Sequence, residues 1–208
     1  MPTAQATDWT HYPAKDARDA RCRSRWYYHV HSGESRDAKS QGHFHLFLHR
    51  SQLSGSGEPK VWPPQRENCK AHVAHIAALS VDKAGQPTSW FAVNRFVTNE
   101  FLYTAGTMIR HLPDFNVEHA SADPIVNRFL TAMVALYRDE IAALLQERDE
   151  RHAAMQARLG PDAYEKTSGV EVLSRTRIDL ETKLVGAKAS PANLAPLRSE
   201  IPRCLAGR

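Results

Sequence analysis

The sequence predicts an α+β fold: an antiparallel β-sheet of four or more strands, with a long helix from the C-terminal half and one or two short helices packed on it. Two observations lead to this prediction. Apolar segments of the first half have strand length or alternate with period two, whereas apolar residues of the second half recur at helical spacing. Strands followed by helices along a chain are typical of α+β domains.

Length and composition indicate one globular unit. The chain has 208 residues, of which 42% are hydrophobic and 24% are charged, which is enough to bury a core without disulfides. We expect an N-terminal arm over 1–25, a single α+β domain over 26–187 and a C-terminal tail over 188–208. Within the domain, a β-rich half over 26–100 precedes a helical half over 101–187.

Several classes of protein are excluded. The sequence has no stretch of about 18 consecutive apolar residues, so we expect no membrane span. The first residues are polar and lack the apolar core of a secretory signal. The odd, widely spaced cysteines Cys22, Cys69 and Cys204 argue against a disulfide framework and a thiolate zinc site. We therefore expect a protein of the reducing cytoplasm.

The net charge of +4 is placed unevenly, because residues 1–70 carry 11 Lys and Arg against 7 Asp and Glu. The excess lies in Arg18, Arg21, Arg23 and Arg25. A nucleic-acid surface would be a denser basic stripe with aromatic residues set to stack on bases, so we expect no nucleic-acid partner. This segment is either a solvated basic edge or a region that attracts anionic small molecules.

The first two strands are predicted over 26–31 (WYYHVH) and 43–50 (HFHLFLHR), both with alternating side chains. The polar stretch 32–42 joins them, which predicts an antiparallel hairpin. Residues 51–70 form a surface loop in this prediction, because Pro63 and Pro64 exclude a central strand or a helix.

A second hairpin is predicted from strands over 72–82 and 89–98, with a turn between them that contains Gly85 and Pro87. A long helix follows from 123 to about 158. Asp123 caps its start, Pro124 takes the first helical position, and Gly160–Pro161 ends it. After Gln146 the apolar stripe fades, so we expect a solvent-exposed extension in which His152 is solvated. A shorter helix is predicted over 179–187.

Histidines are the most informative feature of the sequence. His29 and His31 lie two apart on the first strand, and His43 and His45 lie two apart on the second. Side chains at i and i+2 of a strand share a face. If His29 lies opposite His45 and His31 lies opposite His43, four imidazoles stand on one face of the hairpin, close enough to share a metal ion.

Imidazole ligands suit iron, copper and zinc, and Glu34 at the mouth of the hairpin loop is a candidate carboxylate ligand or general base. Alternatives remain at this point: a solvent-exposed histidine-rich face, core histidines bonded to the backbone, haem ligation by one histidine, and metal-free acid–base chemistry. His72 and His75 lie three apart, so at most one of them joins this face.

Further candidates lie around the end of the fourth predicted strand. Asn94 and Arg95 interrupt an otherwise apolar segment, where they either form a satisfied polar network or anchor an anionic or carbonyl-bearing substrate. Glu100 and Tyr103 follow at the exit of the strand, where functional loops tend to lie, and with Glu34 and Arg95 they are the candidate catalytic residues.

Three segments, WYYHVH, GHFHLFLHR and HIAALSVDKAGQPTSWFAVNRFVTNE, resemble an uncharacterised bacterial family, a domain of unknown function with YYH-x-H, GHFH-x-F and NR-aromatic-VT-x-E segments. The likeness spans roughly residues 9–185. The residues of this chain that match are Tyr28, His29, His31, Gly42, His43, Phe44, His45, Asn94, Arg95, Thr98 and Glu100. The polar loop before Gly42 departs from the family. The resemblance implies a domain extent and no reaction.

These observations together predict a metal-dependent enzyme that acts on a small molecule, and anionic molecules are among the candidate substrates. An oxidoreductase with iron or copper is favoured slightly over a zinc hydrolase. One alternative is a haem- or metal-binding module without turnover, in which aromatic residues surround a flat pocket; its aromatic residues would be Trp26, Tyr27, Phe47, Trp90 and Phe91. Another is a metal-free interaction protein.

Overall fold

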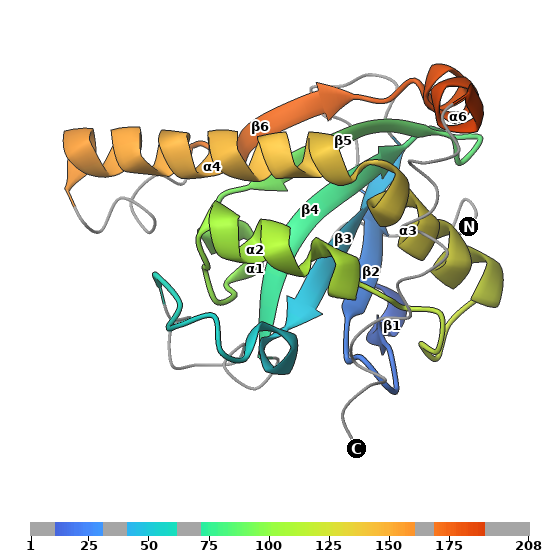
Figure 1. Cartoon of the computed structure of the whole chain (residues 1–208), viewed down its shortest axis with the longest axis horizontal. Helices are drawn as coiled ribbons and strands as arrows, with labels where there is room; N and C mark the ends of the chain where they lie inside the picture. Colours follow the sequence, from blue (N-terminus) through green and yellow to red (C-terminus); the bar gives the residue numbers. More distant parts are fainter. Residues whose placement is uncertain (1–10, 31–40, 62–71, 161–168, 190–208) are drawn as a thin grey trace.

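A computed structural model describes residues 11–30, 41–61, 72–160 and 169–189. Its centre is a six-stranded antiparallel sheet in which every strand pairs with the next one along the chain, in the order β1-β2-β3-β4-β5-β6 (Figure 1). The strands are β1 (Tyr12–Arg18), β2 (Arg25–Val30), β3 (Gly42–His49), β4 (Val73–Val81), β5 (Pro87–Val93) and β6 (Val172–Arg177).

Helices cover one face of this sheet, with α2, α3 and α4 in front of the strands in Figure 1. The helices are α1 (Arg95–Thr98), α2 (Ala105–His111), α3 (Pro124–Leu136), α4 (Arg138–Leu159) and α6 (Leu180–Ala189), with short 3-10 turns η1 (Arg50–Leu53) and η3 (Leu112–Asp114). The predicted α+β class is therefore confirmed, and the sheet has six strands where four or more were expected.

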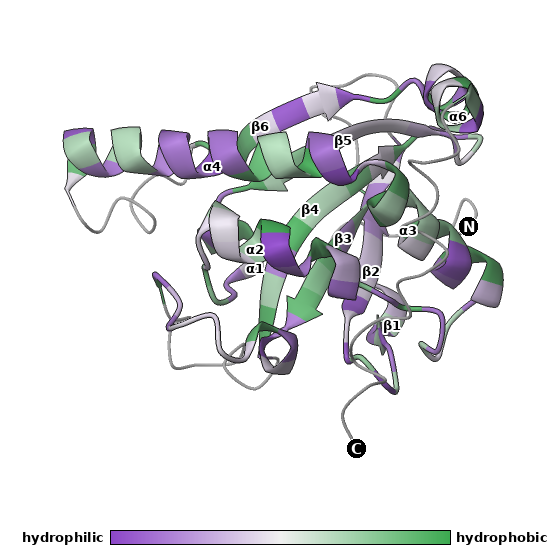
Figure 2. Cartoon of the chain, in the orientation of Figure 1, coloured by the Kyte–Doolittle hydropathy of each residue, from purple (hydrophilic) through white to green (hydrophobic). Residues whose placement is uncertain are grey.

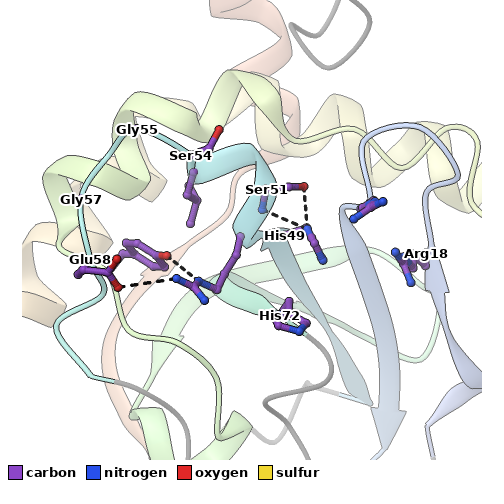
Figure 3. A pocket seen from close by; sticks show the side chains of 12 residues that line it. Arg18, His49, Ser51, Ser54, Gly55, Gly57, Glu58 and His72 are labelled. Atoms are coloured by element: carbon purple, nitrogen blue, oxygen red, sulfur yellow. Dashed lines mark hydrogen bonds and ion pairs between the residues drawn. The ribbon is translucent and has the colours of Figure 1, made fainter. Parts of the chain in front are cut away.

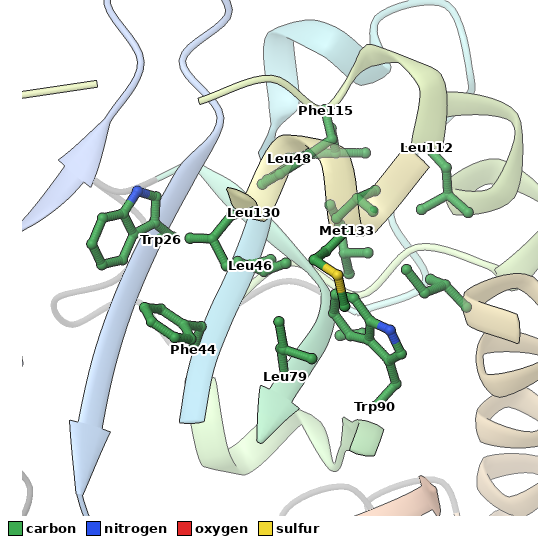
Figure 4. Close-up of a cluster of buried hydrophobic side chains, with 14 of the residues drawn as sticks. Trp26, Phe44, Leu46, Leu48, Leu79, Trp90, Leu112, Phe115, Leu130 and Met133 are labelled. Carbon is green, nitrogen blue, oxygen red and sulfur yellow. The ribbon is translucent and has the colours of Figure 1, made fainter. Parts of the chain in front are cut away.

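The main core lies between this helical layer and the sheet. Phe44, Leu46 and Leu48 alternate along β3 and are buried against Leu130 and Met133 of α3 (Figure 4). Each such side chain contributes about 1.5–3 kcal/mol when it leaves water. The alternation leaves the residues between them on the other face of the sheet.

That second face is buried as well. All nine residues of β4 are buried, and Figure 2 shows this strand as hydrophobic over most of its length. Smaller apolar clusters lie on this face, one formed by Tyr27, Phe47 and Val73 and another that includes Ala78 and Phe91. The histidines of β3 therefore lie in an enclosed layer and are not a solvent-exposed stripe.

Both predicted hairpins are present, as β2–β3 and β4–β5. The predicted start of the long helix is also correct, because the carboxylate of Asp123 accepts hydrogen bonds from the backbone N–H groups of Ile125 and Val126. The shorter C-terminal helix appears as α6.

Three expectations about the elements are wrong, and one strand was not expected. Residues 12–18, expected in an irregular arm, form β1, and residues 172–177 add β6. Residues 95–98, expected in a strand, form α1. The long helix is divided into α3 and α4 at Tyr137, whose φ of −105° and ψ of 25° depart from helical geometry.

No helix of the described residues is both long and apolar enough to cross a membrane. Cys22, in the connection between β1 and β2, is disulfide-bonded, whereas the spacing of the cysteines argued against a disulfide framework.

Gly42, at the start of β3, gives a test of the packing beside the histidines. A Cβ atom there would lie 2.5 Å from both the backbone oxygen of His29 and the hydroxyl oxygen of Tyr28. Because Tyr28 is buried, we expect Gly42→Ala to lower the free energy of unfolding by about 1–3 kcal/mol. Urea unfolding followed by circular dichroism measures this. The matched control is Gly106→Ala, where nothing lies within 4 Å of the added atom, and an equal loss in both variants would contradict the prediction.

Candidate metal centre

The register of β2 and β3 decides which histidines meet. His29 lies opposite His43, and His45 lies opposite Tyr27. The expected pairing of His29 with His45 is therefore wrong by two residues, and His31 and Glu34 lie outside the described residues. A shift of two residues leaves every side chain on its expected face. Three of the four predicted ligands consequently still come together.

His29, His43 and His45 form a compact triad, with one ring nitrogen from each lying within 4.8 Å of those from the other two. The Nε2 atoms of His29 and His43 are 2.6 Å apart, so one ring donates an N–H to the other. The ring centroids of His43 and His45 are 4.8 Å apart, and those of His29 and His45 are 5.1 Å apart. All three rings cross at steep angles, which directs ring edges toward one another.

His45 is the most enclosed member of the triad and is fully buried. Its Nδ1 lies 3.0 Å from Nε2 of His75 on β4. Its own Nε2 is buried and has no hydrogen-bond partner among the described residues. A buried nitrogen without a hydrogen-bond partner lowers the stability of a fold. Nε2 of His45 is therefore an unused candidate ligand atom at the centre of the triad.

A β-bulge places His75 next to His45. Leu46 lies opposite Ala77, whereas the next residue of β3, Phe47, lies opposite His75, so β4 contains one extra residue at this point. Ile76 and Ala77 both join the helix-side core as a result. A bulge shifts the alternation of side chains along the strand by one residue. His75 therefore points to the face of the sheet that carries His45.

Burial is the largest cause that holds the pKa of His45 well below its ordinary value, and the imidazoles of His43, His75, His29 and His11 act in the same direction. Burial likewise lowers the pKa of His75 to about 3. Both rings are neutral at pH 7. Neutral imidazole is the form that binds a metal ion, so no proton has to leave His45 first.

Aromatic rings enclose the triad. Tyr27 packs against His45 with ring centroids 4.9 Å apart, and Phe91 meets the edge of His43 at 5.1 Å. His11 stacks on Tyr27 at 3.8 Å and hydrogen-bonds Asp16 through Nδ1. His11 escaped prediction because it lies in the segment expected to be irregular, where no strand alternation assigns it a face.

The triad fits a transition-metal ion after a small adjustment. Imidazole nitrogens bound at about 2.0–2.1 Å in tetrahedral geometry lie about 3.3 Å apart. The 2.6 Å contact between His29 and His43 must therefore open by several tenths of an ångström, and the proton that they share must leave. His45 would use Nε2, since its Nδ1 is held by His75. A ligating histidine whose second nitrogen is hydrogen-bonded is the usual arrangement in metal sites.

Asn94 and Arg95 are not among the residues that form the triad. The backbone N–H of Asn94 donates to the carbonyl of Glu171, and its side chain donates to the carbonyl of Val170, so Asn94 ties β5 to the segment before β6. Arg95 is 1% exposed, and its charge acts on Glu100 and His152.

Glu100 is a buried carboxyl group that receives a hydrogen bond from Thr98. Burial raises its pKa to about 7, although that hydrogen bond and the charges of Arg95 and Arg148 oppose the shift. The charge of Glu100 contributes to a raised pKa of Tyr27, whose main cause is burial. The charge of Glu100 thus acts on the aromatic ring that packs on the triad, but Glu100 is not one of the three residues that form the triad.

Two further expectations need correction. Trp26 and Trp90 belong to the helix-side core, whereas Tyr27, Phe47 and Phe91 lie on the histidine face, so these five aromatic residues do not surround one pocket. His152, expected in solvent, is 2% exposed. Burial is the first cause that lowers its pKa to about 4.

Glu100 gives a prediction about pH. Its folded-state pKa lies above the unfolded value of 4.5, so the fold favours the protonated carboxyl group and loses stability as pH rises from about 4.5 to 7. We expect Glu100→Gln to remove this loss and to be more stable than wild type at pH 8, by at most about 3 kcal/mol. Urea unfolding at pH 5 and pH 8 tests this. Glu58→Gln, at a carboxylate that is 76% exposed, is the control. Equal pH dependence of wild type and Glu100→Gln would contradict the prediction.

Comparison with known proteins bears on the family. No curated protein and no solved structure matches the chain. A family model described as a domain of unknown function, DUF6969, matches residues 1–178. This range covers all six strands of the sheet and the histidine triad. The chain belongs to this DUF6969 family of domains of unknown function.

Proposed function

We propose that this protein is a metal-dependent enzyme with a mononuclear centre ligated by His29, His43 and His45. The observation that carries the proposal is the buried, unpartnered Nε2 of His45, which lies in the triad of imidazoles while His75 holds the opposite nitrogen. Three protein ligands leave at least one coordination position for water or substrate, which is typical of catalytic rather than structural metal sites.

The charge of the ligand set favours an anionic fourth ligand. Three imidazoles are neutral, so a divalent ion held by them keeps its full double positive charge in a buried layer. A hydroxide or an anionic oxygen of a substrate would offset this charge. A small molecule with an anionic or carbonyl oxygen is therefore the proposed substrate class.

We favour redox chemistry at copper or iron over hydrolysis at zinc. An all-nitrogen ligand set suits copper directly, whereas iron sites of this kind generally add a carboxylate, for which Glu34 remains the proposed ligand. When bound, copper or iron would supply electron transfer and activation of an oxidant. Zinc would instead lower the pKa of bound water for hydrolysis.

Glu100 is our proposed proton carrier. A buried carboxyl group with a pKa near 7 can both take up and release a proton at neutral pH. Arg95, whose charge stabilises the Glu100 carboxylate, is the proposed positioning residue, with Asn94 beside it at the start of α1. The alternative function is a metal- or haem-binding module without turnover.

The first prediction of this proposal concerns metal binding. Untagged protein should bind one equivalent of Cu²⁺ or Zn²⁺, and His43→Ala, the substitution of the least buried triad member, should weaken that binding at least 10-fold. Competition with a chromophoric chelator measures the affinity, elemental analysis identifies the metal bound in cells, and the Cu²⁺ resonance spectrum reports the ligating nitrogens. His119→Ala is the control, because this side chain is 43% exposed and pairs with Asp19. Binding that His43→Ala leaves unchanged would contradict the centre, and a haem absorption band would favour the alternative.

The hydrogen bond between His45 and His75 gives a second prediction of this proposal. His75→Leu should lower the metal affinity 10- to 100-fold although it leaves all three ligands in place, because Nδ1 of His45 loses its partner. His75→Gln retains an acceptor and should lose less. Thermal unfolding of the metal-free variants separates this effect from misfolding. Equal affinities for wild type and His75→Leu would show that His75 does not orient His45.

A further inference from the structure

A separate cavity of about 550 Å³ lies near the end of β3, at η1 and the β1–β2 connection (Figure 3). Its wall includes three arginines from three different segments: Arg18 at the end of β1, Arg23 in the connection and Arg50 at the start of η1. His49 and His72 add imidazoles to the same wall. A volume of this size holds a small organic molecule.

Positive charge in this cavity is weakly compensated. Among the described residues, the one ion pair of the three arginines joins Arg50 to Glu58, at 3.9 Å, and Glu58 is 76% exposed. No described carboxylate pairs with Arg18 or Arg23. The charges of Arg23 and Arg18 also help to lower the pKa of His49 to about 4, after burial as the main cause. An anion would relieve this mutual repulsion.

Several of these donors are held in place before any ligand arrives. Nε of Arg50 donates to the hydroxyl of Tyr103 at 3.0 Å, and its guanidinium lies 4.4 Å from the ring centroid of Phe101. This contact gives Tyr103, a candidate catalytic residue, a place in this second site. Nδ1 of His49 accepts a hydrogen bond from the backbone of Ser51, which leaves the proton of the neutral ring on Nε2.

The backbone is strained at two points of the same wall. Arg23 has φ of 65° and His72 has φ of 51°, in the left-handed region that non-glycine residues seldom adopt. The buried carboxylate of Asp19 holds the turn at Arg23 by accepting hydrogen bonds from the backbone N–H groups of Arg21 and Cys22. Such strain concentrates at functional sites.

We propose that this cavity binds a small organic molecule through a phosphate group, which Arg18, Arg23 and Arg50 contact. Three guanidinium groups that arrive from three segments match the oxygens of a tetrahedral phosphate better than the two oxygens of a carboxylate. His49 would add an N–H donor. The site is independent of the histidine triad, because none of the triad residues lines it.

Inorganic phosphate and pyrophosphate are the probes, titrated by calorimetry at constant ionic strength against the wild-type protein. We expect Arg23→Gln and Arg18→Gln to weaken binding at least 5-fold each. Arg21→Gln is the matched control, because Arg21 is an exposed arginine of the same connection outside the cavity wall. His43→Ala should bind both probes as wild type does, which separates this site from the metal centre.

Three results would overturn the proposal. The first is phosphate binding that is no tighter than chloride binding, the second is an Arg21→Gln variant that weakens binding as much as Arg23→Gln does, and the third is succinate binding that is tighter than the binding of phosphate and pyrophosphate. The substituted arginines at positions 18 and 23 are exposed, so these variants should fold, and their unchanged circular dichroism verifies this.

Discussion

The two-residue alternation of β3 is the constraint on which the candidate centre depends. Phe44, Leu46 and Leu48 must face the helical layer to form the core, so His43 and His45 are forced onto the opposite face. A one-residue slip of this strand would bury the imidazoles among leucines and expose the core residues to the wrong layer. The stability of the sheet and the position of the triad are therefore fixed by the same packing.

The alternation of side chains along β2 and β3 could be predicted from the sequence, and this alternation gives the face of the sheet on which each histidine lies. The register between β2 and β3 could not be predicted. A pairing shifted by two residues leaves each side chain on the same face of the sheet and changes only which side chains lie opposite each other. The sequence predicts that at most one of His72 and His75 joins the histidine face, but it could not show that His75 does, because the bulge at Ile76 and Ala77 shifts the alternation within β4 and the apolar run of that strand carries no sign of it. β1 and β6 were missed because their exposed, mixed side chains lack clear alternation.

Strand β3 contributes residues to two polar sites, the histidine triad and the arginine-lined cavity, which suit ligands of opposite charge. The triad consists of imidazoles in an aromatic layer, and its ring nitrogens suit a cation. The cavity at the other end of β3 is lined by three arginines, two of which have no ion pair among the described residues, and these guanidinium groups suit an anion. A rigid strand that holds His45 and His49 four residues apart keeps the two sites about 13 Å from each other. That spacing lets both sites be occupied at once without a steric clash between their ligands.

The bulge in β4 makes the surroundings of His45 depend on chain length as well as on side-chain identity. Removal of one residue at Ile76 or Ala77 would restore regular pairing and keep His75 opposite Phe47, on the same face as His45, whereas regular pairing of the strand at its present length would send His75 into the helix-side core. Every imidazole of the triad would still be present in such a shortened chain. Insertions and deletions at this point of the strand are thus as informative about the centre as substitutions of its ligands.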